Sequence, residues 1–543
     1  MRNCLEKRTE CKGILSCRDC TSHLFRYRFR WVFCQLEVLR HCLPHSVRQV
    51  LDHLPESLDE TYLHVLRAIP PVNQAHAHRM LQCLVAAVRP LRVSELAGLL
   101  SFEFDTAQGG IPKYHEAWQL DDQTQAVLST CSSLVTIIDD SQYGQIVQFS
   151  HFSVKEFLLS NRLDPSLGDV SRYRIRSESA HTVLTQACLG TLLHLDDHID
   201  KESVKSFPLA GYAARHWFEH AQFGDVAWRV KEGMYTLFDS DKPYFAAWVE
   251  LYDIDSPKFY ERDLSAEISP NLTPNPLYYA MLCGFYDLVE HLATKSPQHV
   301  NAICGRYSFP LLAALGEGHV EVAELLLKHG ANVDVLEKTG KTVLLKALSR
   351  PQLNLASIAK FLLEHGADVN ARDNTLKNSL HFLAEHGGNL EVARMLVQHG
   401  ADINSRDDSG KTPLHTLSER RISKEDDVLD HARLLLQHNA DANSQDKDNQ
   451  TPLHLAIGHN RFKLAQLFLE HGAEPNAENN TGKTPLHVLS ECQVNGQTDG
   501  DVLNHEVLER GAENRVYEDD GTEIGTVKDT FSGNLSRLTQ ILP

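Results

Sequence analysis

The fold of this chain is decided by one stretch in its C-terminal half, Thr451–Gly472, which reads TPLHLAIGHNRFKLAQLFLEHG. Thr451 suits the N-cap of a helix, and Pro452 suits the first helical position, where no backbone N–H is needed. Within 464–468, apolar residues recur at helical spacing and give a second helix one apolar face. We expect that helix to end at Gly472, because glycine readily adopts the left-handed conformation that follows a helix. The stretch therefore predicts two short helices.

Near-copies of this stretch fill the C-terminal half of the chain. A period near 33 residues with a TPLHxA motif resembles the ankyrin repeat, in which each unit contributes one turn and two short helices. One unit cannot bury its apolar face alone, so neighbouring units are expected to stack. The positions equivalent to the threonine of TPLH are Asn275, Phe309, Thr342, Asn378, Thr412, Thr451 and Thr484, with a degenerate eighth copy near Thr522.

The residue that follows each second helix supports this alignment. Asparagine is the residue that best tolerates the left-handed conformation after glycine, and it replaces glycine once. We therefore predict a left-handed backbone at every one of these positions. They are Gly330, Gly366, Gly400, Asn439, Gly472 and Gly511.

The charge of the chain is unevenly distributed. The net charge is −19, yet residues 1–50 hold ten Lys/Arg against four Asp/Glu, so the remainder is strongly acidic. An acidic body argues against nucleic-acid binding through the repeats. We find no run of 18 apolar residues and no apolar core in the first 30, so we expect neither a membrane span nor a signal peptide. Twelve scattered cysteines favour a reducing, cytoplasmic setting.

The region before the repeats reads as helices followed by a two-stranded wing. Ser57–Glu60 has the S-x-x-E pattern of a capping box, and Ser153–Glu156 repeats it before a closing helix. Two strands are predicted between them, Leu134–Ile138 and Gln145–Phe149. The order predicts a winged-helix domain. Its DNA-contacting helix would lie near Asp121–Cys131, which contains no Lys or Arg, so no nucleic acid is expected as a partner.

Several phrases of the same region resemble the tail of NACHT-type STAND proteins, which are signal-transduction NTPases abundant in filamentous fungi. The phrases read RFRWVFCQLEVLRHCLP, VLDHLPESLDETYLHVLRAI, RPLRVSELAGLL and VQFSHFSVKEFLLS. Two more, GYAARHWFEHAQFGDV and KPYFAAWVELYDID, resemble the helical connector that such fungal proteins place before their repeats. The resemblance implies a P-loop NTPase followed by a helical segment, a winged helix and ankyrin repeats. It also implies that the winged helix packs on the NTPase and helps to hold its off state.

The nucleotide-binding part of that family is not found in this sequence. A Walker A motif needs Gly-x4-Gly-Lys-Ser/Thr to cradle phosphates. Three GKT triplets begin at Gly340, Gly410 and Gly482, but Val335, Ser405 and Ala477 stand where the first glycine should be. Each triplet immediately precedes a first helix, so we interpret all three as hairpin turns and expect no nucleotide cofactor.

The many histidines are assigned to structure rather than to catalysis or metal binding. His381, His415, His454 and His487 occupy the fourth position of TPLH, and His329, His365, His399, His438 and His471 end second helices, where a cation is favourable. Near the N-terminus, Cys4, Cys11, Cys17, Cys20 and His23 include one CxxC, but a zinc site would need a second ligand pair at comparable spacing. No protease or hydrolase motif appears, so we expect neither an enzyme nor a metal site.

The candidate functional surface follows from the geometry of stacked repeats. First helices and their hairpins form one extended concave face, the usual binding surface of such arrays. Its candidate contact residues at the hairpin tips are Lys338, Thr339, Asn374, Thr375, Asp408, Ser409, Lys447, Asp448, Asn480 and Thr481, and just after TPLH they are Phe382, Thr416, Leu455 and Val488. For Phe382 and Leu455, packing between units is an equal alternative. Two polar inserts, Arg420–Asp430 and Gln493–Asp501, are either recognition loops or tolerated drift.

The sequence thus predicts a mostly α protein, with an ankyrin-repeat solenoid preceded by a helical and winged-helix α+β region. The expected parts are a basic, cysteine-containing segment 1–24, a helical segment 25–74, a winged helix 75–160, a helical connector 161–270 and an ankyrin array 271–543. The expected function is non-catalytic recognition of a protein partner, as the scaffold or sensor of a STAND-type signalling protein. The alternative is the sensor half of a nucleotide-switched NTPase whose P-loop domain is missing from this chain.

Overall fold

The structure is a computed structural model that describes residues 57–104, 110–119, 121–195, 207–255, 275–350, 353–387, 389–420, 425–485 and 487–489, and the backbone of the strands β6 (Arg515–Tyr517) and β7 (Glu523–Thr526). The chain divides into two units, Met1–Leu292 and Ala293–Pro543. The predicted segment 1–24, the start of segment 25–74, the insert Gln493–Asp501, Gly511 and the degenerate repeat near Thr522 lie outside the described residues.

The first part of the N-terminal unit is a helical region with a small antiparallel sheet. Its helices are α4 (Leu58–Arg67), α5 (Gln74–Ala86), α6 (Val93–Gly98), α7 (Gln123–Cys131) and α8 (Phe152–Leu159). The strands of this sheet are β1 (Leu91–Arg92), β4 (Val135–Asp140) and β5 (Gly144–Phe149), in the order β1-β5-β4. The strands β2 (Phe102–Glu103) and β3 (Lys113–Tyr114) pair in a separate two-stranded sheet. The two predicted wing strands are confirmed, and so is the winged-helix fold.

The local signals that start these helices are partly those expected. The capping box at Ser57 is confirmed, because the Ser57 hydroxyl accepts a hydrogen bond from the Glu60 N–H and the Glu60 carboxylate accepts one from the Ser57 N–H. The capping box expected at Ser153 is wrong. Helix α8 begins two residues earlier than predicted, with His151 as its N-cap, and the Ser153 hydroxyl lies 2.7 Å from the Tyr62 hydroxyl. The Ser153 side chain, which the local pattern assigns to capping, instead makes a buried tertiary contact.

A helical connector follows the wing and surrounds an aromatic core. Its helices are α9 (Ser177–Leu192), α11 (Ala210–Ala221), α12 (Val226–Arg229), α13 (Lys231–Leu237) and α14 (Tyr244–Leu251). Trp217 and Trp248 are fully buried with their rings in an edge contact, and Phe238 packs against both. The Trp248 indole N–H donates to the Ala214 carbonyl at 2.8 Å, which satisfies its only polar group.

The connector also covers the first helix pair of the repeats, α15 (Pro276–Cys283) and α16 (Tyr286–Lys295). The Tyr278 and Tyr279 hydroxyls donate to the carboxylates of Asp255 and Asp253, each at 2.7 Å. Beside them, the Gln222 side-chain amide donates to the Cys283 carbonyl at 2.7 Å. An end repeat exposes an apolar face that needs a cap, and the connector supplies one.

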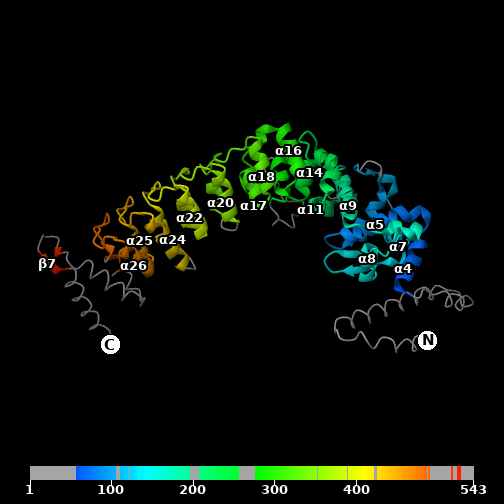
Figure 1. Ribbon diagram of the computed structural model, residues 1–543, viewed down its shortest axis with the longest axis horizontal. Helices are drawn as coiled ribbons and strands as arrows, with labels where there is room; N and C mark the ends of the chain where they lie inside the picture. The colour runs from blue at the N-terminus through cyan, green and yellow to red at the C-terminus, as the bar shows by residue number, and fades with distance from the viewer. Residues whose placement is uncertain are drawn as a thin grey trace, which may run out of the picture. The chain divides into compact units, whose positions relative to one another are not determined.

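Five further helix pairs form the array of the C-terminal unit, and they follow one another from green to orange in Figure 1. The first helices are α17 (Pro310–Gly316), α19 (Val343–Leu348), α21 (Ser379–His386), α23 (Pro413–Glu419) and α25 (Pro452–Gly458). The second helices are α18 (Val320–Lys328), α20 (Leu355–Glu364), α22 (Leu390–Gln398), α24 (Glu425–Gln437) and α26 (Phe462–Glu470). Consecutive first helices pack on one another, so the two kinds of helix form two layers.

The predicted helix ends are confirmed within the described residues. Thr451 caps α25, where its hydroxyl accepts a hydrogen bond from the His454 N–H, and Pro452 is the first helical residue. The predicted left-handed positions all have a positive φ of 66° to 88°. They are Gly330, Gly366, Gly400, Asn439 and Gly472. The helix-turn-helix units read from the sequence are therefore present in the structure.

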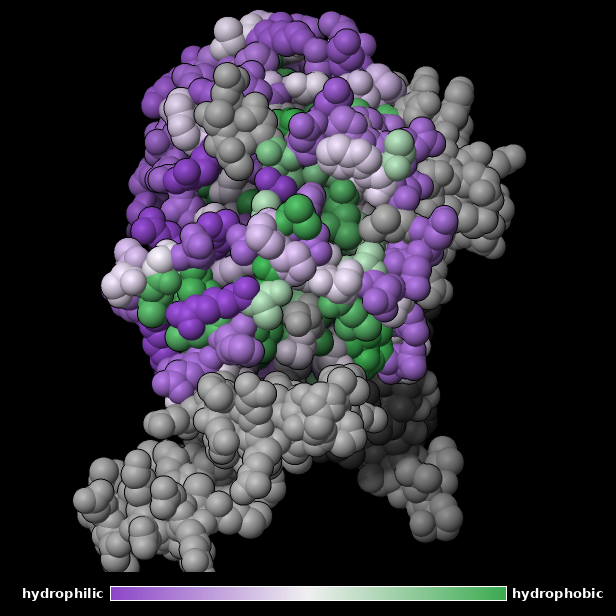
Figure 2. All heavy atoms as spheres, turned by 90° about the vertical axis from the view of Figure 1, so that its right-hand side faces the viewer, coloured by the Kyte–Doolittle hydropathy of each residue, from purple (hydrophilic) through white to green (hydrophobic). Residues whose placement is uncertain are grey.

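The surface of the N-terminal unit carries both polar and apolar groups. On the face shown in Figure 2, hydrophobic side chains gather in patches between hydrophilic ones. Exposed large apolar residues of this unit include Val72, Trp118, Phe152, Phe223 and Trp228. Among the described residues, no helix has the length and the apolar character needed to cross a bilayer.

Candidate protein-interaction surface

Four hairpins, those that begin at Asp373, Asp407, Asp446 and Asn479, are each built around one side-chain acceptor at the first corner. The Asp407 carboxylate, 8% exposed, accepts the N–H groups of Ser409 and Lys411, both at 2.9 Å. This Asx turn holds the tip in one conformation, because the side chain replaces a backbone acceptor. Asp373, Asp446 and Asn479 make the equivalent pairs of bonds in their hairpins. The sequence analysis missed these residues, although an Asp or Asn before each tip is the signal of such a turn.

Adjacent hairpin tips are joined by backbone hydrogen bonds. The N–H of Asn374 donates to the Thr339 carbonyl at 3.0 Å, and the N–H of Asp408 donates to the Thr375 carbonyl at 2.9 Å. The same bond recurs from Lys447 to Ser409 and from Asn480 to Asp448. The tips therefore form one continuous row. Its predicted contact residues have exposed side chains, namely Lys338, Thr339, Asn374, Thr375, Asp408, Ser409, Lys447, Asp448, Asn480 and Thr481.

Below the tips, the histidine of TPLH joins each repeat to the next. The Nδ1 atom of His415 accepts the Thr412 N–H at 3.1 Å, and its Nε2–H donates to the Gln450 carbonyl at 3.0 Å. His381 and His454 make the same pair of bonds. Burial lowers the pKa of all three, although the bond to the carbonyl opposes the shift. The predicted structural role of these histidines is confirmed.

The histidines at the ends of second helices are structural too. The rings of His365, His399 and His471 each donate from Nδ1 to a carbonyl four residues earlier, at 2.8 to 2.9 Å. Each ring thereby satisfies one of the carbonyls that a helix end leaves without a partner. Within the described residues, no three His, Cys, Asp or Glu side chains gather as a metal site would require.

The GKT triplets are hairpin turns, as predicted. Gly340, Gly410 and Gly482 stand at the last corner of their hairpins with φ of 78°, 78° and 70°. In each, the glycine N–H donates to the carbonyl three residues earlier and closes the turn. A left-handed residue at this corner is typical of three-residue hairpin loops.

A groove of about 490 Å³ opens between two of the hairpins and the first helices that follow them. It brings together four of the residues predicted from sequence, namely Thr375, Asp408, Ser409 and Thr416. It also includes Lys377, Glu385, Asp407, Lys411, Glu419 and Arg420, which were not predicted. The size lies in the range of small binding sites, and the lining is polar and charged.

Two of the three cations in the groove are matched by an acid. Lys377 pairs with Glu385 at 2.7 Å, and Lys411 pairs with Glu419 at 2.5 Å. Burial opposes both charges of the first pair, but their hydrogen bond prevails, so the pKa of Lys377 is raised and that of Glu385 is lowered. Both pairs join residues eight apart at the same place in their repeats. That repetition is a signal which an alignment of the repeats could have revealed.

The third cation, Arg420, has no partner among the described residues. It follows the last residue of α23 and lies against Gly387, where a Cβ atom would overlap its guanidinium. Its Nη1 atom is buried without a hydrogen-bond partner. Burial lowers the pKa of Arg420 and the positive charge of Arg461 adds to the shift, whereas the carboxylate of Asp427 opposes it. An unsatisfied buried donor costs about 1–3 kcal/mol, so the described residues leave this guanidinium incompletely satisfied.

Two of the three apolar candidates after TPLH are buried and are not available as contact residues. Phe382 is 3% exposed and Leu455 is 7% exposed, so the structure supports packing between units, which was the alternative for both. The Lys341 ammonium lies 4.6 Å from the centre of the Phe382 ring and covers it. Val488 is half-buried. Side chains on the inner side of a first helix pack on the next first helix, which the TPLH alignment alone does not show.

The insert Arg420–Asp430 is less of a loop than expected. Helix α24 already begins at Glu425, and Val428 and Leu429 within it are buried. Residues 421–424 lie outside the described residues. The expectation of an entirely polar, exposed insert is therefore wrong, because part of the added length extends the second helix and contributes to the core.

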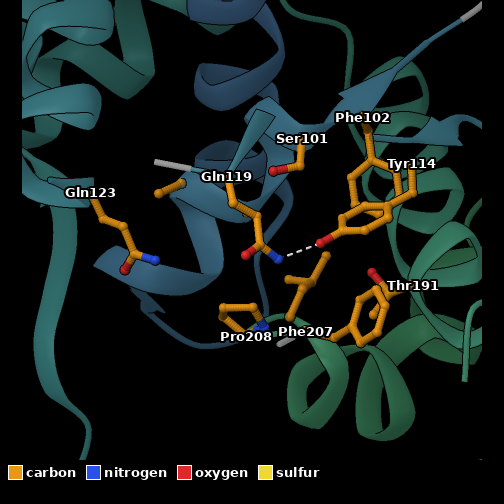
Figure 3. Close-up of a pocket in the computed structure, with 11 residues that line it drawn as sticks. Ser101, Phe102, Tyr114, Gln119, Gln123, Thr191, Phe207 and Pro208 are labelled. Atoms are coloured by element: carbon orange, nitrogen blue, oxygen red, sulfur yellow. Dashed lines mark hydrogen bonds between the residues drawn. The ribbon is translucent and has the colours of Figure 1, made fainter. Parts of the chain in front are cut away.

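A smaller cavity lies in the N-terminal unit and is shown in Figure 3. It has a volume of about 60 Å³ and is lined in part by Ser101, Tyr114, Gln119 and Thr191. The Gln119 side-chain amide donates to the Tyr114 hydroxyl at 2.5 Å. Because a water molecule needs about 10–15 Å³ of such space, the cavity suits a few waters rather than a substrate.

Family models match three parts of the chain. Two models of ankyrin repeats match residues 277–373 and 421–499, and residues 354–417. A model described as the winged helix domain of GPI inositol-deacylase matches residues 68–168. The chain therefore contains ankyrin repeats preceded by a winged-helix domain, and ankyrin repeats are a protein-interaction module.

Individual relatives share parts of this arrangement. The azaphilone pigments biosynthesis cluster protein L of Monascus ruber is 29% identical over 296 residues, which are 52% of this chain and 61% of that protein. The ankyrin repeat and SAM domain-containing protein 6 of Mus musculus is 33% identical over 97 residues, which are 16% of this chain and 11% of that protein. The chain thus spans less than two thirds of either relative. The crystal structure of the ankyrin repeat domain of Bcl-3 has 26% sequence identity, a TM-score of 0.34, and covers 40% of this chain and 98% of that one.

Proposed function

We propose that the array binds a protein partner along its hairpin tips and first helices, at the groove between Thr375 and Arg420. The observation that carries the proposal is that this groove combines exposed tip side chains with mostly half-buried charged side chains. The buried Asp407 carboxylate and the tip-to-tip hydrogen bonds fix the backbone around it. A rigid surface loses little entropy on binding, which favours recognition.

The proposal is tested by reversing one charge in the groove. Asp408→Lys changes an exposed side chain, so the backbone bonds of its hairpin remain. Glu364→Lys makes the same charge change at the end of α20, in the layer of second helices, and serves as the control. Partners captured by the full chain are purified and titrated against each variant. We expect Asp408→Lys to weaken binding about tenfold, a loss of about 1.4 kcal/mol, and Glu364→Lys to leave it unchanged. Equal binding by all three proteins would rule out the groove.

We further propose that this recognition serves a STAND-type signalling protein. The order of winged helix, helical connector and ankyrin array supports this context, because the sequence phrases that resemble NACHT proteins occur in the same order. Translating the genomic sequence upstream of Met1 provides the test. An in-frame GxxxxGK[ST] within about 150–250 codons, the size of one domain, is the expected result. Its absence there would separate this chain from the nucleotide switch and leave the partner-binding proposal standing.

A further inference from the structure

We propose that the groove recognises an extended segment of the partner, with Leu376 contacting an apolar side chain and Arg420 pairing with a carboxylate. The inference rests on the proposed function and specifies the chemistry of the partner. It is carried by two residues that have unfavourable surroundings within the described part of the chain, Leu376 beside the groove and Arg420 in its lining.

Leu376 occupies a corner that the other hairpins give to a different kind of residue. The equivalent positions hold Gly340, Gly410, Asn449 and Gly482, all with positive φ. Leu376 has the same backbone, with φ of 61° and its N–H donating to the Asp373 carbonyl at 2.9 Å. A bulky residue is disfavoured there, because its Cβ atom crowds the following carbonyl.

Burial of the Leu376 side chain does not compensate for this unfavourable backbone. The side chain is 47% exposed, although it is large and apolar. Its neighbours in the chain, Thr375 and Lys377, both line the groove, so Leu376 lies next to the groove along the hairpin. A disfavoured backbone and an exposed apolar side chain at one position favour a role in contacting another molecule.

Arg420 supplies the polar end of the site. Lys377 and Lys411 are each neutralised by a glutamate, whereas Arg420 has neither an ion pair nor a hydrogen bond among the described residues. A guanidinium presents its donors in a planar fork that matches both oxygens of a carboxylate. A carboxylate from the partner would complete this group and satisfy the buried Nη1 atom.

The length of α23 sets the reach of the partner segment along the groove. The groove follows α23 from Lys411, just before the helix, past Thr416 to Arg420 just after it. Seven helical residues span about 10 Å at 1.5 Å per residue. An extended segment advances about 3.3 Å per residue, so about three residues of the partner would lie along this helix.

Random linear peptides displayed on phage and selected on the full chain test this chemistry. We expect the enriched peptides to share an apolar residue and an Asp or Glu. One enriched peptide is then synthesised, together with a version whose acid is replaced by its amide. We expect the amide peptide to bind the wild-type chain about tenfold more weakly than the acid peptide does. The Arg420→Gln variant should bind both peptides equally weakly, because the guanidinium and the carboxylate are coupled. Arg433→Gln, on the second helix α24, is the control and should behave as wild type.

Leu376→Gly separates binding from folding. Glycine suits the left-handed corner, so the variant should unfold at a temperature no lower than wild type while binding the peptide about tenfold more weakly. Asn449→Gly makes a similar change at the matching corner of another hairpin and should leave binding unchanged. Loss of binding without loss of stability is a result that a purely structural role of Leu376 does not give.

The outcomes distinguish this inference from the proposed function. Peptides that are sensitive to Asp408→Lys but insensitive to Arg420→Gln and Leu376→Gly would overturn the inference and keep the groove as the binding site. Peptides that are insensitive to all three variants would overturn both. Absence of enriched peptides, or enriched peptides without the paired apolar and acidic residues, would also overturn the inference.

Discussion

At the scale of single residues, the joins between repeats depend on asparagines that the sequence analysis did not single out. The Asn370 side chain donates to the Gly400 carbonyl at 2.9 Å and accepts the Asp402 N–H at 2.7 Å. Asn301, Asn404 and Asn443 do the same in their repeats. An amide is needed because one side chain must both donate and accept. Asp334 stands at the corresponding place in the remaining repeat and can only accept when ionised.

Asp334→Asn should therefore stabilise the array. The carboxylate already accepts the Asp368 N–H at 3.0 Å, and an amide would add a donor for the Gly366 carbonyl. We expect a gain of about 1 kcal/mol in the free energy of unfolding in urea at pH 7. Asn370→Asp is the reverse control and should lose a similar amount.

The pH dependence of this gain has a definite sign. Burial raises the pKa of Asp334, despite the hydrogen bond from the Asp368 N–H. The folded chain therefore binds this proton more tightly than the unfolded chain, and the contribution of Asp334 to stability falls as the pH rises through its titration. The advantage of Asp334→Asn should be larger at pH 7 than at pH 3. An equal advantage at both would contradict this assignment.

The histidines of TPLH should make the array sensitive to mild acid. Their Nδ1 atoms accept backbone N–H groups, so only the neutral ring fits, and burial lowers the pKa of each from 6.5. The stability they contribute is complete above pH 6.5 and is lost as the pH falls through the folded pKa values. The free energy of unfolding of the wild type in urea should decrease from pH 7.5 to pH 5.5. The decrease should be up to about 1.4 kcal/mol for each histidine and each unit by which its pKa is lowered. His415→Asn should show a smaller fall.

At the scale of the hairpin, two adjacent aspartates have opposite roles. Asp407 is buried and holds two backbone N–H groups, whereas the Asp408 side chain is exposed at the tip. We expect Asp407→Ala to cost about 1.5–3 kcal/mol, the usual loss for hydrogen bonds to a charged group. Asp408→Ala should change the stability by less than about 0.5 kcal/mol. Thermal unfolding of the two variants measures the difference, and equal losses would contradict the distinction.

The hairpins and helices also show where sequence analysis succeeds. Thr451, Pro452 and the left-handed glycines were predictable, because each is set by its own backbone position. The lone Arg420 was not, since the absence of a partner depends on what the fold places near Gly387. Leu376 was partly predictable, because an alignment of the hairpin corners shows a leucine where four other hairpins have Gly or Asn. The role of Phe382 was ambiguous, because the sequence of one TPLH motif does not show that the next repeat buries this side chain.

At the scale of the whole molecule, the connector packs against the first repeat and covers it, as a neighbouring repeat does elsewhere in the array. The Trp217 ring lies 5.6 Å from that of Phe285, and the Tyr278 and Tyr279 hydroxyls bond to the end of the connector. An array needs a terminal cap of this kind to remain folded. The connector is therefore part of the stability of the first repeat.

Trp248→Ala tests this dependence. The tryptophan is fully buried in the connector and contacts Tyr279 of α15 at 5.9 Å between ring centres. We expect a loss of about 3–5 kcal/mol, as for other buried aromatic residues. In hydrogen exchange, amides of α11, α14 and α15 should lose protection together, while those of α23 and α25 remain protected. Loss confined to α11 and α14 would show that the connector does not cap the array.

The central claim is that a partner binds the groove of the array, and hydrogen exchange of the full chain tests it most directly. The measurement compares the chain alone with the chain saturated by a partner protein captured with it. We predict added protection in residues 373–420, where the tips of Thr375 and Asp408 and the end of α23 meet. Protection confined to residues 57–255, with residues 373–420 unchanged, would contradict the account.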